Sequence, residues 1–469
     1  MIQTAARRTR RALGISAALA AALAGAACAT STSTDTGQVT SANPYPTTAP
    51  AVTLQFWEGF SGTQETPVQQ MVNNFEKLHP NIHIKVVDNI TDAQIQQGIK
   101  SGKNGPDVAL SFSTNDVGSY CSTGEWVNLS NYLKVSGVDM AKTFPGPLIK
   151  YTQYNGDQCS LPMENDAYGL YYNKNEFQAA NLDPSSPPTT LAQLQSDAVA
   201  LTKKNPDGSF AQLGFVPLID YFEQTGEHFT QTFDLKWQNA QHQSVIAADP
   251  GFTQMLQWQQ SIEQAILDKA PQSTFAQLTS FVNKAEAPGE FAAGQNPFET
   301  GAVAMQIDGE WRNANIQQET PSLSYGTVPF PTSDAGQYGG GYLSGTIVGI
   351  SAKSKNQAAD WEFLEYMTMN TQSLVTLANA LFNVPSTFAA LDSPQLTRLP
   401  QFQTFVKISG DANSAYSPSS TNGDEYLTTA ETWIQNNWLV ASPMSTAGLP
   451  SALQKLDSQI DSDTKIAGS

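Results

Sequence analysis

The sequence predicts an α/β fold, and three observations carry this prediction. The chain has 469 residues, of which 40% are apolar and only 14% are charged, so it can bury two cores or one large core. Residues 52–87 have the patterns of a strand, a helix and a second strand in succession. Further strand and helix patterns recur as far as about residue 367, which is typical of a sheet covered by helices.

The first of these units follows from the spacing of its apolar residues. Apolar and polar residues alternate from Val52 to Phe56, as they do in a strand. From Pro67 to Leu78 the apolar side chains recur at helical spacing, and a second strand is expected over residues 82–87. This order predicts parallel strands joined by a right-handed crossover.

The later elements are predicted on the same grounds. Residues 107–112 form a largely apolar run after a Gly-Pro turn, and we expect them to be a buried strand. Apolar stripes predict helices around residues 191–201 and 252–266. The remaining patterns predict two strands and one helix, at residues 302–307, 346–350 and 356–367.

The N-terminus has the pattern of an export signal. Four arginines, at positions 7, 8, 10 and 11, precede an Ala-rich apolar run, so residues 1–27 are expected to be a signal peptide that the mature protein lacks. The segment from Leu23 to Cys28 resembles a bacterial lipoprotein signal, in which Cys28 becomes the lipidated first residue. Simple cleavage after Ala27 or Ala29 and export by the twin-arginine route remain open.

A tether is expected to follow the signal. Residues 28–50 are mostly Ser, Thr and Pro, a composition typical of a flexible linker. No later stretch has the run of about 20 apolar residues that a membrane span requires. We therefore expect an exported protein that is lipid-anchored on the outer face of the bacterial cytoplasmic membrane and meets the membrane through its N-terminal lipid alone.

The charge argues against nucleic acid as a partner. The formal net charge is −18, and removal of the four signal arginines takes it to −22, so a polyanion would be repelled over most of the surface. Arg312 and Arg398 are the arginines that remain, and a dedicated phosphate clamp is not expected. If Cys28 carries lipid, Cys121 and Cys159 are expected to form a disulfide in an oxidising compartment, with two buried free thiols as the alternative.

Several motifs occur along the chain in the order of a known family. Residues 56–62 (Phe-Trp-Glu-Gly-Phe-Ser-Gly) precede the first helix, and residues 168–174 (Tyr-Gly-Leu-Tyr-Tyr-Asn-Lys) follow later. Residues 298–305 and Gly309-Glu310-Trp311 come next. Together, over about residues 51–390, these segments resemble the extracellular solute-binding proteins of family 1. These are the sugar-binding subunits of ABC importers, and maltose- and glycerol-phosphate-binding proteins are relatives.

The resemblance implies a periplasmic-binding-protein-like fold of two α/β lobes, joined by a multi-crossover hinge with the ligand in the cleft. On this chain, lobe one would comprise residues 51–163 and 309–367, and lobe two residues 164–308 and 368–469. The resemblance also implies a monomer without cofactor or catalytic activity. Such a protein captures a neutral sugar or oligosaccharide by hinge closure and delivers it to the transmembrane subunits of a permease.

A sugar site needs aromatic platforms for the apolar ring faces and polar groups for the hydroxyls. Trp57 follows the first strand at the edge where α/β sheets bind ligands, so we expect it to stack on the sugar while Glu58 or Ser61 binds hydroxyls. Packing of Trp57 beneath the next helix is the alternative. Asn115 and Asp116 follow the third strand and would accept hydrogen bonds from sugar hydroxyls, or else cap a helix.

Further candidates lie at the expected crossovers. Glu164 and Asp166 could reach the ligand from the hinge, unless their loop is simply solvated. The resemblance places Trp311 in the cleft, where it should stack on a sugar ring. Arg312 beside it either binds the ligand or pairs with a nearby carboxylate.

The last candidates come from the second lobe and from a Gly-rich segment. We expect Trp237 to be the platform of the second lobe and include Tyr221 as a further candidate, whereas core packing is the favoured interpretation for Phe222. At Gly340 and Gly341 the missing side chains let backbone N–H groups approach a ligand, although a turn with positive φ would also require glycine. Two further polar contacts are expected from Tyr342 and Asn383.

Other functions are weighed against this one. The sequence has no Gly-rich phosphate loop, zinc-protease motif or nucleophile elbow, and its four histidines do not form a metal-ligand set, so no metal is expected. A receptor for glycerol phosphate or a glycerophosphodiester is the alternative within transport. A secreted glycoside hydrolase is a different class, because Asp308 with Glu310, or Glu164 with Asp166, could form an acid and base pair. A surface adhesion protein is the third alternative function.

Overall fold

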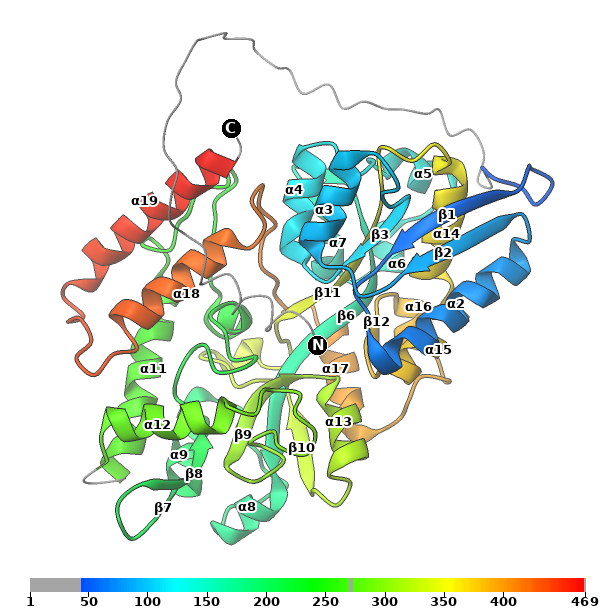
Figure 1. Cartoon of the computed structure of the whole chain (residues 1–469). Coiled ribbons are helices and arrows are strands. Elements are labelled where there is room, and N and C mark those ends of the chain that lie inside the picture. The colour runs from blue at the N-terminus through cyan, green and yellow to red at the C-terminus, as the bar shows by residue number, and fades with distance from the viewer. Residues whose placement is uncertain (1–43, 270–272, 468–469) are drawn as a thin grey trace, which may run out of the picture.

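The computed structural model describes residues 44–269 and 273–467, and most of its strands belong to one mixed sheet (Figure 1). These strands are β1 (Val52–Trp57), β2 (Ile82–Val87), β3 (Val108–Ser111), β6 (Leu161–Asn173), β7 (Lys203–Lys204), β8 (Phe210–Phe215), β9 (Val303–Gly309), β10 (Tyr325–Val328), β11 (Leu343–Ile350) and β12 (Val384–Pro385). Their order is β2-β1-β3-β11-β6-β9-β8-β7, and β10 and β12 pair with β6 outside this path. A separate hairpin pairs β4 (Gln153–Tyr154) with β5 (Asp157–Gln158).

Helices cover the sheet, as the sequence predicts for an α/β fold. In the first half of the chain they are α2 (Glu65–Leu78), α3 (Asp92–Ser101), α4 (Val117–Ser122), α5 (Ser130–Val135), α6 (Met140–Thr143), α7 (Gly146–Tyr151), α8 (Lys174–Ala179), α9 (Leu191–Leu201) and α10 (Thr230–Phe233). In the second half they are α11 (Pro250–Lys269), α12 (Phe275–Glu286), α13 (Arg312–Glu319), α14 (Gln357–Met369), α15 (Thr371–Leu381), α16 (Phe388–Leu391), α17 (Pro400–Gly410), α18 (Glu425–Asn437) and α19 (Leu449–Ala467).

The first predicted unit is present. β1 pairs with β2 in parallel, with Val52 opposite Ile82, and β1 also pairs in parallel with β3. Between β1 and β2 the chain forms α2, which buries its apolar stripe of Val68, Met71, Val72 and Phe75. The sheet becomes mixed because β11 pairs antiparallel with β3.

The long strand β6 connects the two ends of the sheet. All 13 of its residues are buried. From Leu161 to Ala167 it pairs with β11, and from Tyr168 to Tyr172 it pairs with β9. Figure 1 shows β6 running from the part of the molecule that contains β1 to β3 into the part that contains β8 and β9. A single strand therefore belongs to both parts.

The buried apolar residues form two cores, and β6 contributes to both, since Tyr168, Leu170 and Tyr172 pack in the second core while Ala167 and Tyr171 pack in the first. Ala167 packs in the first core with residues of β1, β3, α2 and α14, whereas Tyr168 packs in the second core with residues of β8, β9, α9 and α11. The chain passes from the second core to the first between Ile307 and Ile316. It makes the same passage again between Tyr342 and Leu343. We call the parts of the chain around these cores the first and the second lobe.

The cores divide the chain differently from the boundaries expected above. Residues 368–469 were assigned as a whole to lobe two, but the buried apolar residues from Leu374 to Ile408 pack in the first core. The second core contains Phe330 and Tyr342, although both lie within the segment assigned to lobe one. The physical reason is that α15 contacts α2 and that α17 packs on β6, so residues distant in sequence share one apolar interior.

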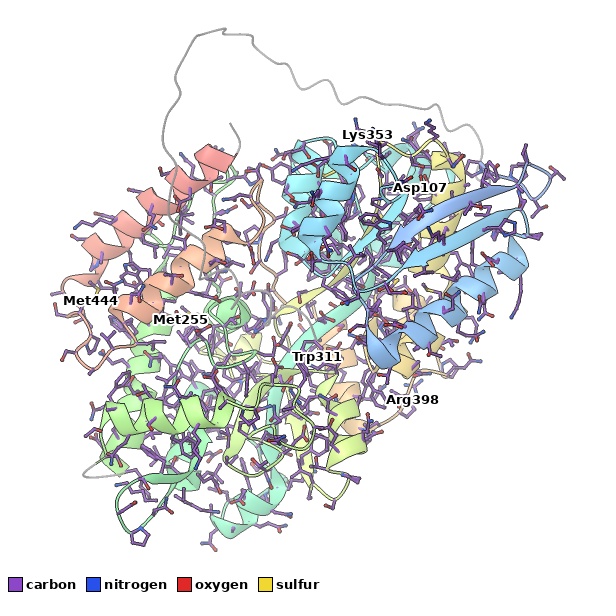
Figure 2. All side chains as sticks on the ribbon, viewed as in Figure 1. Asp107, Met255, Trp311, Lys353, Arg398 and Met444 are labelled. Carbon is purple, nitrogen blue, oxygen red and sulfur yellow. A yellow bond between two sulfur atoms is a disulfide. The ribbon has the colours of Figure 1, made fainter. Side chains whose placement is uncertain are left out.

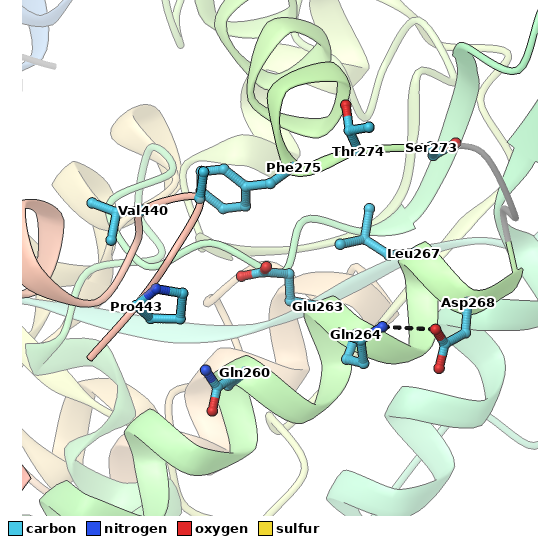
Figure 3. Close-up of a pocket in the computed structure, with 11 residues that line it drawn as sticks. Gln260, Glu263, Gln264, Leu267, Asp268, Ser273, Thr274, Phe275, Val440 and Pro443 are labelled. Carbon is cyan, nitrogen blue, oxygen red and sulfur yellow. Dashed lines mark hydrogen bonds between the residues drawn. The ribbon is translucent and has the colours of Figure 1, made fainter. Parts of the chain in front are cut away.

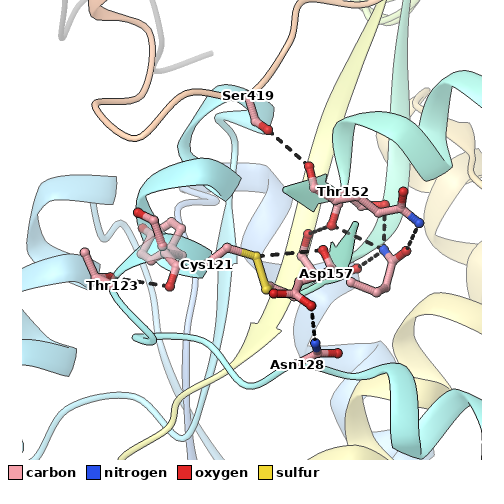
Figure 4. The surroundings of a disulfide bond; sticks show 12 residues. Cys121, Thr123, Asn128, Thr152, Asp157 and Ser419 are labelled. Atoms are coloured by element: carbon pink, nitrogen blue, oxygen red, sulfur yellow. Dashed lines mark hydrogen bonds between the residues drawn. A yellow bond between two sulfur atoms is a disulfide. The ribbon is translucent and has the colours of Figure 1, made fainter. Parts of the chain in front are cut away.

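A disulfide joins Cys121 of α4 to Cys159, which follows the β4–β5 hairpin, with Cα atoms 5.8 Å apart (Figure 4). The Asn128 amide donates a hydrogen bond to the Asp157 carboxylate at 2.7 Å, and the Ser419 hydroxyl donates to the backbone carbonyl of Gln153 at 3.1 Å. These bonds fix the hairpin against the first lobe. The expected signal peptide, Cys28 and the tether as far as residue 43 lie outside the described residues.

None of the helices within residues 44–269 and 273–467 is both long and apolar enough to cross a bilayer.

Candidate functional site

Four aromatic rings meet where β6 enters the second core. The ring of His228 lies stacked on Tyr168 with centroids 3.8 Å apart, and Trp311 meets Tyr168 edge-on at 5.5 Å. Tyr342 lies 5.7 Å from the same tyrosine. We call Tyr168, His228, Trp311 and Tyr342 the aromatic cluster. Trp311 is half-buried and the other three are buried, so Trp311 is the member whose ring keeps the most accessible surface.

The position of Trp311 follows from its local sequence. Trp311 comes two residues after Gly309, the last residue of β9, and precedes the first residue of α13. A Cβ at Gly309 would lie 2.3 Å from the indole, so the ring can fold back over the backbone only because residue 309 is glycine. Figure 2 shows Trp311 near the middle of the molecule, between the two lobes. The Gly-Glu-Trp motif therefore builds an aromatic platform at the lobe boundary.

Three buried carboxyl groups lie on β6 and just after β9, the strands that lead to Tyr168 and Trp311 of the aromatic cluster. Glu164 and Asp166 belong to β6, and Glu310 immediately precedes Trp311. Glu164 and Glu310 have no exposed surface, whereas Asp166 is 9% exposed. We call Glu164, Asp166 and Glu310 the carboxyl cluster.

Asn383 links two members of the carboxyl cluster. Its Nδ2 donates hydrogen bonds to Oδ1 of Asp166 and to Oε1 of Glu310, both at 3.0 Å. The second oxygen of Glu310, Oε2, accepts the backbone N–H of Ala167 at 2.8 Å. Sequence analysis selected Asp166 and Asn383 separately, and the structure brings them together.

Burial controls the ionisation of these groups. It raises the pKa of Asp166 to about 6, although the hydrogen bond from Asn383 lowers it. Burial raises the pKa of Glu310 well above its ordinary value, and the nearby Asp166 charge raises it further. The pKa of Glu164 is raised well above its ordinary value for the same two reasons, and neither of its carboxyl oxygens has a hydrogen-bond partner among the described residues.

Comparisons with known proteins place these features in a family. Residues 61–372, more than half of the chain, match the bacterial extracellular solute-binding protein family. The chain belongs to this family.

Individual relatives and solved structures are similar to this chain at low sequence identity. The sn-glycerol-3-phosphate-binding periplasmic protein UgpB of Rhizobium meliloti is 25% identical over 31% of this chain, and the match spans 35% of that relative, about a third of its length. The multiple sugar-binding protein of Streptococcus mutans is 23% identical, covering 68% of this chain and 71% of that protein. The solved structure of CpMnBP1 with mannotriose bound superposes with a TM-score of 0.71 at 24% identity, covering 87% of this chain and 100% of that one.

In this solute-binding protein, Arg312 does not face a ligand. Its guanidinium is 1% exposed and is held by Asp308 at 2.7 Å, by Glu299 at 3.3 Å and by Glu290 at 3.4 Å. Of the two roles expected for Arg312, the structure contains the pairing with nearby carboxylates. The reason is that α13 turns its first residue into the second lobe, where burial of an arginine requires compensating charge.

Trp237 and Tyr221 also belong to the interior of the second lobe. Trp237 is 2% exposed, packs edge-on against Phe252 and Tyr426, and donates its indole N–H to Thr230 at 2.9 Å. Trp237 therefore packs within the second core. Tyr221 is also 2% exposed, and its ring packs against Phe222.

Tyr342 and the glycines before it serve packing in this protein. The Tyr342 hydroxyl donates to Glu227 at 2.9 Å and lies 3.0 Å from the Ser417 hydroxyl, so its polar end is occupied inside the second core. The N–H of Gly341 donates to Ser414 at 3.2 Å. A Cβ at Gly340 would lie 2.8 Å from the backbone of Ser414. Close backbone packing accounts for these two glycines without positive φ at either position.

The candidates of the first lobe lie at the carboxyl end of β1 and β3, as expected. Trp57 is half-buried, and a Cβ at Gly98 of α3 would come 2.6 Å from its ring, so the indole packs against α3 and not beneath the next helix, α2. Glu58 has no exposed surface and accepts the N–H of Phe60, while Ser61 is half-buried. Burial, with the nearby Asp88 carboxyl, raises the pKa of Glu58 to about 9, so Glu58 is neutral near pH 7.

Asn115 and Asp116 lie in a short 3₁₀ turn, η3 (Thr114–Asp116), after β3. The backbone carbonyl of Asn115 accepts the N–H of Ser420 at 3.2 Å, and a Cβ at Gly423 would lie 2.1 Å from the Asp116 carboxylate. The two residues therefore meet the segment that leads from α17 to α18. Asp116 occupies the N-cap position of α4, but its side chain makes no capping hydrogen bond.

Sequence analysis missed two members of the aromatic cluster. Tyr168 was noted only as part of a motif, and His228 only as one of four histidines. His228 lies in η4 (Glu227–Phe229), 60 positions beyond Tyr168, and no local pattern links the two rings. The one available signal is the alternation of β6, which places Asp166 and Tyr168 on the same face.

A cavity of about 470 Å³ lies in the second lobe between α11, the start of α12 and the loop after α18 (Figure 3). It is lined by Gln260, Glu263, Gln264, Leu267, Asp268, Ser273, Thr274, Phe275, Val440, Ala441 and Pro443. None of these is a predicted site residue. Its polar groups are largely engaged with one another, since Gln264 donates to Asp268 at 2.7 Å and Thr274 caps α12. The cavity is separate from the lobe boundary.

Within the described parts of the chain, no group of three or more His, Cys, Asp or Glu side chains is arranged to hold a metal ion.

Proposed function

We propose that this protein is the substrate-binding component of an ABC importer and captures a neutral sugar or oligosaccharide between its two lobes. The observation that carries the proposal is the half-buried indole of Trp311 at the lobe boundary, which follows Glu310 in the chain, while Asn383 links Glu310 to Asp166. An aromatic face next to a hydrogen-bonding carboxylate suits the apolar face and the hydroxyl rim of a sugar. Among the candidates, Trp311, Asp166 and Asn383 are the residues that we assign to the ligand.

The comparisons support a sugar as the ligand. The multiple sugar-binding protein of Streptococcus mutans matches over two thirds of this chain. CpMnBP1, which shares the fold, was solved with mannotriose bound. A linear neutral oligosaccharide is therefore the first ligand class to test.

The glycerol-phosphate alternative is supported by the relatives named UgpB, but the chemistry of this chain opposes it. Outside the signal peptide the chain has two arginines, and Arg312 is enclosed by three carboxylates. Arg398 is exposed and donates to the carbonyl of Ser393 at 3.0 Å. A dianionic phosphate at the lobe boundary would meet the carboxyl cluster and no guanidinium.

A binding role without catalysis also fits the acidic residues better than hydrolysis does. Asp308 is 1% exposed and accepts the Arg312 Nε–H at 2.7 Å, so it is held within the second lobe. Both oxygens of Glu310 already accept hydrogen bonds. Neither residue has the access to a glycosidic oxygen that an acid and base pair requires.

The remaining features of the proposal concern delivery. Hinge closure about β6 and the neighbouring crossings would present the loaded form to the transmembrane permease subunits. We propose that the protein acts as a monomer, exported and anchored through lipid on Cys28. Cys121 and Cys159 would then be the remaining cysteines, paired as a disulfide in an oxidising compartment.

A thermal-shift screen tests the proposal. The purified mature chain is melted with mannotriose, maltotriose, glycerol 3-phosphate and buffer alone, because a ligand that binds the folded state raises the melting temperature. We expect a rise with at least one neutral oligosaccharide, and no new saccharide species after prolonged incubation. A rise with glycerol 3-phosphate alone would overturn the assignment, and release of shorter sugars would indicate an enzyme.

A further inference from the structure

The lobe boundary contains an asparagine that donates to two carboxyl groups at once. Asn383 lies between α15 and β12 on the first-lobe side, and its Nδ2 reaches Asp166 on β6 and Glu310 at the passage after β9. Glu310 in turn accepts the N–H of Ala167, a residue of β6 that packs in the first core. The Asn383 side chain thus links chain segments that meet at the lobe boundary.

The hydrogen-bond directions define the charge that this arrangement requires. Asn383 presents one N–H to each carboxyl group, and Ala167 presents another to Glu310. Donors that face carboxyl oxygens stabilise the ionised form, so the bridge favours carboxylates at both positions. A proton on either carboxyl would weaken the bonds from Asn383.

The surroundings of the bridge contain acids and phenols but no paired cation. Glu164 neighbours Asp166 on β6, Tyr151 of α7 and Tyr168 of β6 lie within electrostatic reach of Asp166, and Glu310 faces it from the passage after β9. Among the ion pairs of the described residues, none involves Glu164, Asp166 or Glu310. Hydrogen bonds from Asn383 and from the backbone of Ala167 therefore hold the carboxyl groups of Asp166 and Glu310.

We propose that Asn383 and Glu310 are positioning residues that hold the Asp166 carboxylate at the lobe boundary as the acceptor for a ligand hydroxyl, and that mild acid weakens ligand binding by protonating this bridge. This inference rests on the proposed sugar-binding function. Asp166 is the one member of the carboxyl cluster with exposed surface, and it is one residue before Ala167 and two before Tyr168 of the aromatic cluster. Asn383 links it to Glu310, the residue that precedes Trp311 in the chain.

The direction of the pH effect follows from the ionisation of Asp166. Burial raises its pKa to about 6, so the carboxylate is present at pH 7.5 and largely protonated at pH 5. If the ligand hydroxyl donates to the carboxylate, affinity is full above the pKa and is lost as the pH falls through it. The ionised fraction falls about tenfold over this range, and the affinity is expected to fall by about the same factor.

Removal of the bridge changes both the affinity and its pH dependence. Asn383→Leu has a similar side-chain volume but no N–H groups, so it lowers the affinity at pH 7.5 by about tenfold. It also moves the midpoint of the pH profile upward, because the Asn383 hydrogen bond lowers the pKa of Asp166. Glu310→Gln places an amide N–H where Glu310 now accepts a donor, so it also lowers the affinity at pH 7.5. It moves the midpoint downward, because the variant lacks the acid that faces Asp166.

The experiment is calorimetric titration, from pH 5 to pH 8, with the neutral oligosaccharide that raises the melting temperature most. The proteins are the wild type, Asn383→Leu, Asn383→Gln, Glu310→Gln, Asp166→Asn and, as matched control, Asn379→Leu. Asn379 lies in α15, and its amide donates to the carbonyl of Gln395 at 2.8 Å. We expect the wild type and the control to share one midpoint near pH 6, Asn383→Gln to recover part of the affinity, and Asp166→Asn to bind weakly without a midpoint.

Each result separates this inference from the proposed function. A wild-type affinity that is constant from pH 5 to pH 8, or an Asn383→Leu variant with the wild-type midpoint, overturns the bridge while sugar binding stands. Should Asn383→Leu fail to fold, the lower midpoint of Glu310→Gln and the absence of a midpoint in Asp166→Asn decide the question. Failure of the wild type to bind any neutral oligosaccharide at pH 7.5 overturns the proposed function itself.

Discussion

Replacement of Arg312 by methionine tests how the second lobe tolerates its buried charges. The guanidinium is 1% exposed and contacts Asp308, Glu299 and Glu290, at 2.7, 3.3 and 3.4 Å. Arg312→Met keeps a long apolar stem but leaves the three carboxyl groups without their cation. Removal of one partner from a buried ion pair costs about 3–5 kcal/mol, because the remaining charge is neither solvated nor compensated.

The pH dependence of this loss has a definite sign. Burial raises the pKa values of Asp308, Glu290 and Glu299, and the Arg312 charge lowers all three. Without Arg312 the folded-state pKa values rise further above those of the unfolded chain. Stability is then retained where the carboxyls are protonated in both states and lost as the pH rises through the folded-state pKa values. The difference between variant and wild type is therefore larger at pH 8 than at pH 4.

Urea denaturation followed by fluorescence measures the effect as a shift of the midpoint. The matched control is Arg398→Met, because Arg398 is exposed and makes a single hydrogen bond to Ser393. We expect the control to stay within about 1 kcal/mol of the wild type. A loss below about 1 kcal/mol for Arg312→Met at pH 8, or equal losses at pH 4 and pH 8, would refute the charge-burial reasoning.

Three further predictions concern the first lobe. Replacing both Cys121 and Cys159 by serine opens a crosslink of sequence separation 38 and should lower the free energy of unfolding by about 4 kcal/mol, measured by urea denaturation; an unchanged midpoint would show that the crosslink is not formed. Gly98→Ala places a Cβ 2.6 Å from the Trp57 ring and should cost about 1–3 kcal/mol with a change in fluorescence, whereas Gly146→Ala meets nothing within 4 Å and serves as control. Equal effects of the two would argue against packing of Trp57 on α3. Glu58→Gln should raise the melting temperature at pH 8 but not at pH 4, because the pKa of Glu58 is raised from 4.5 to about 9 and its stabilising contribution is lost as the pH rises. A lower melting temperature at pH 8 would contradict this.

The sequence predicts those parts of the fold that depend on neighbouring residues. The periodicities that predict β1, α2 and β2 are local. The structure contains β1 and β2 within one or two residues of the expected ranges, 52–56 and 82–87. The Gly309-Glu310-Trp311 motif also places its indole by local geometry, since the ring needs glycine two residues earlier. Short-range patterns of this kind can be recognised from the sequence without a structure.

Burial and long-range contact could not be predicted in the same way. Trp237 and Trp311 both lie in polar stretches of sequence, yet the first fills the second core and the second is half-buried at the lobe boundary. Which of them faces a ligand depends on helices α11 and α18, which are distant in sequence. The pairing of Asp166 with Asn383 spans 217 positions and has no sequence signal. The lobe boundaries failed for the same reason, because α15 and α17 return to the first core.

The central claim is that Trp311 holds a neutral sugar at the lobe boundary, and calorimetric titration of Trp311→Ala tests it most directly. The sugar that raises the melting temperature most is titrated into the wild type, into Trp311→Ala and into Trp433→Ala, a half-buried tryptophan of α18 that serves as control. The account predicts a 1:1 complex for the wild type and the control, with an affinity about tenfold lower or worse for Trp311→Ala. Equal affinities for Trp311→Ala and the wild type would contradict it.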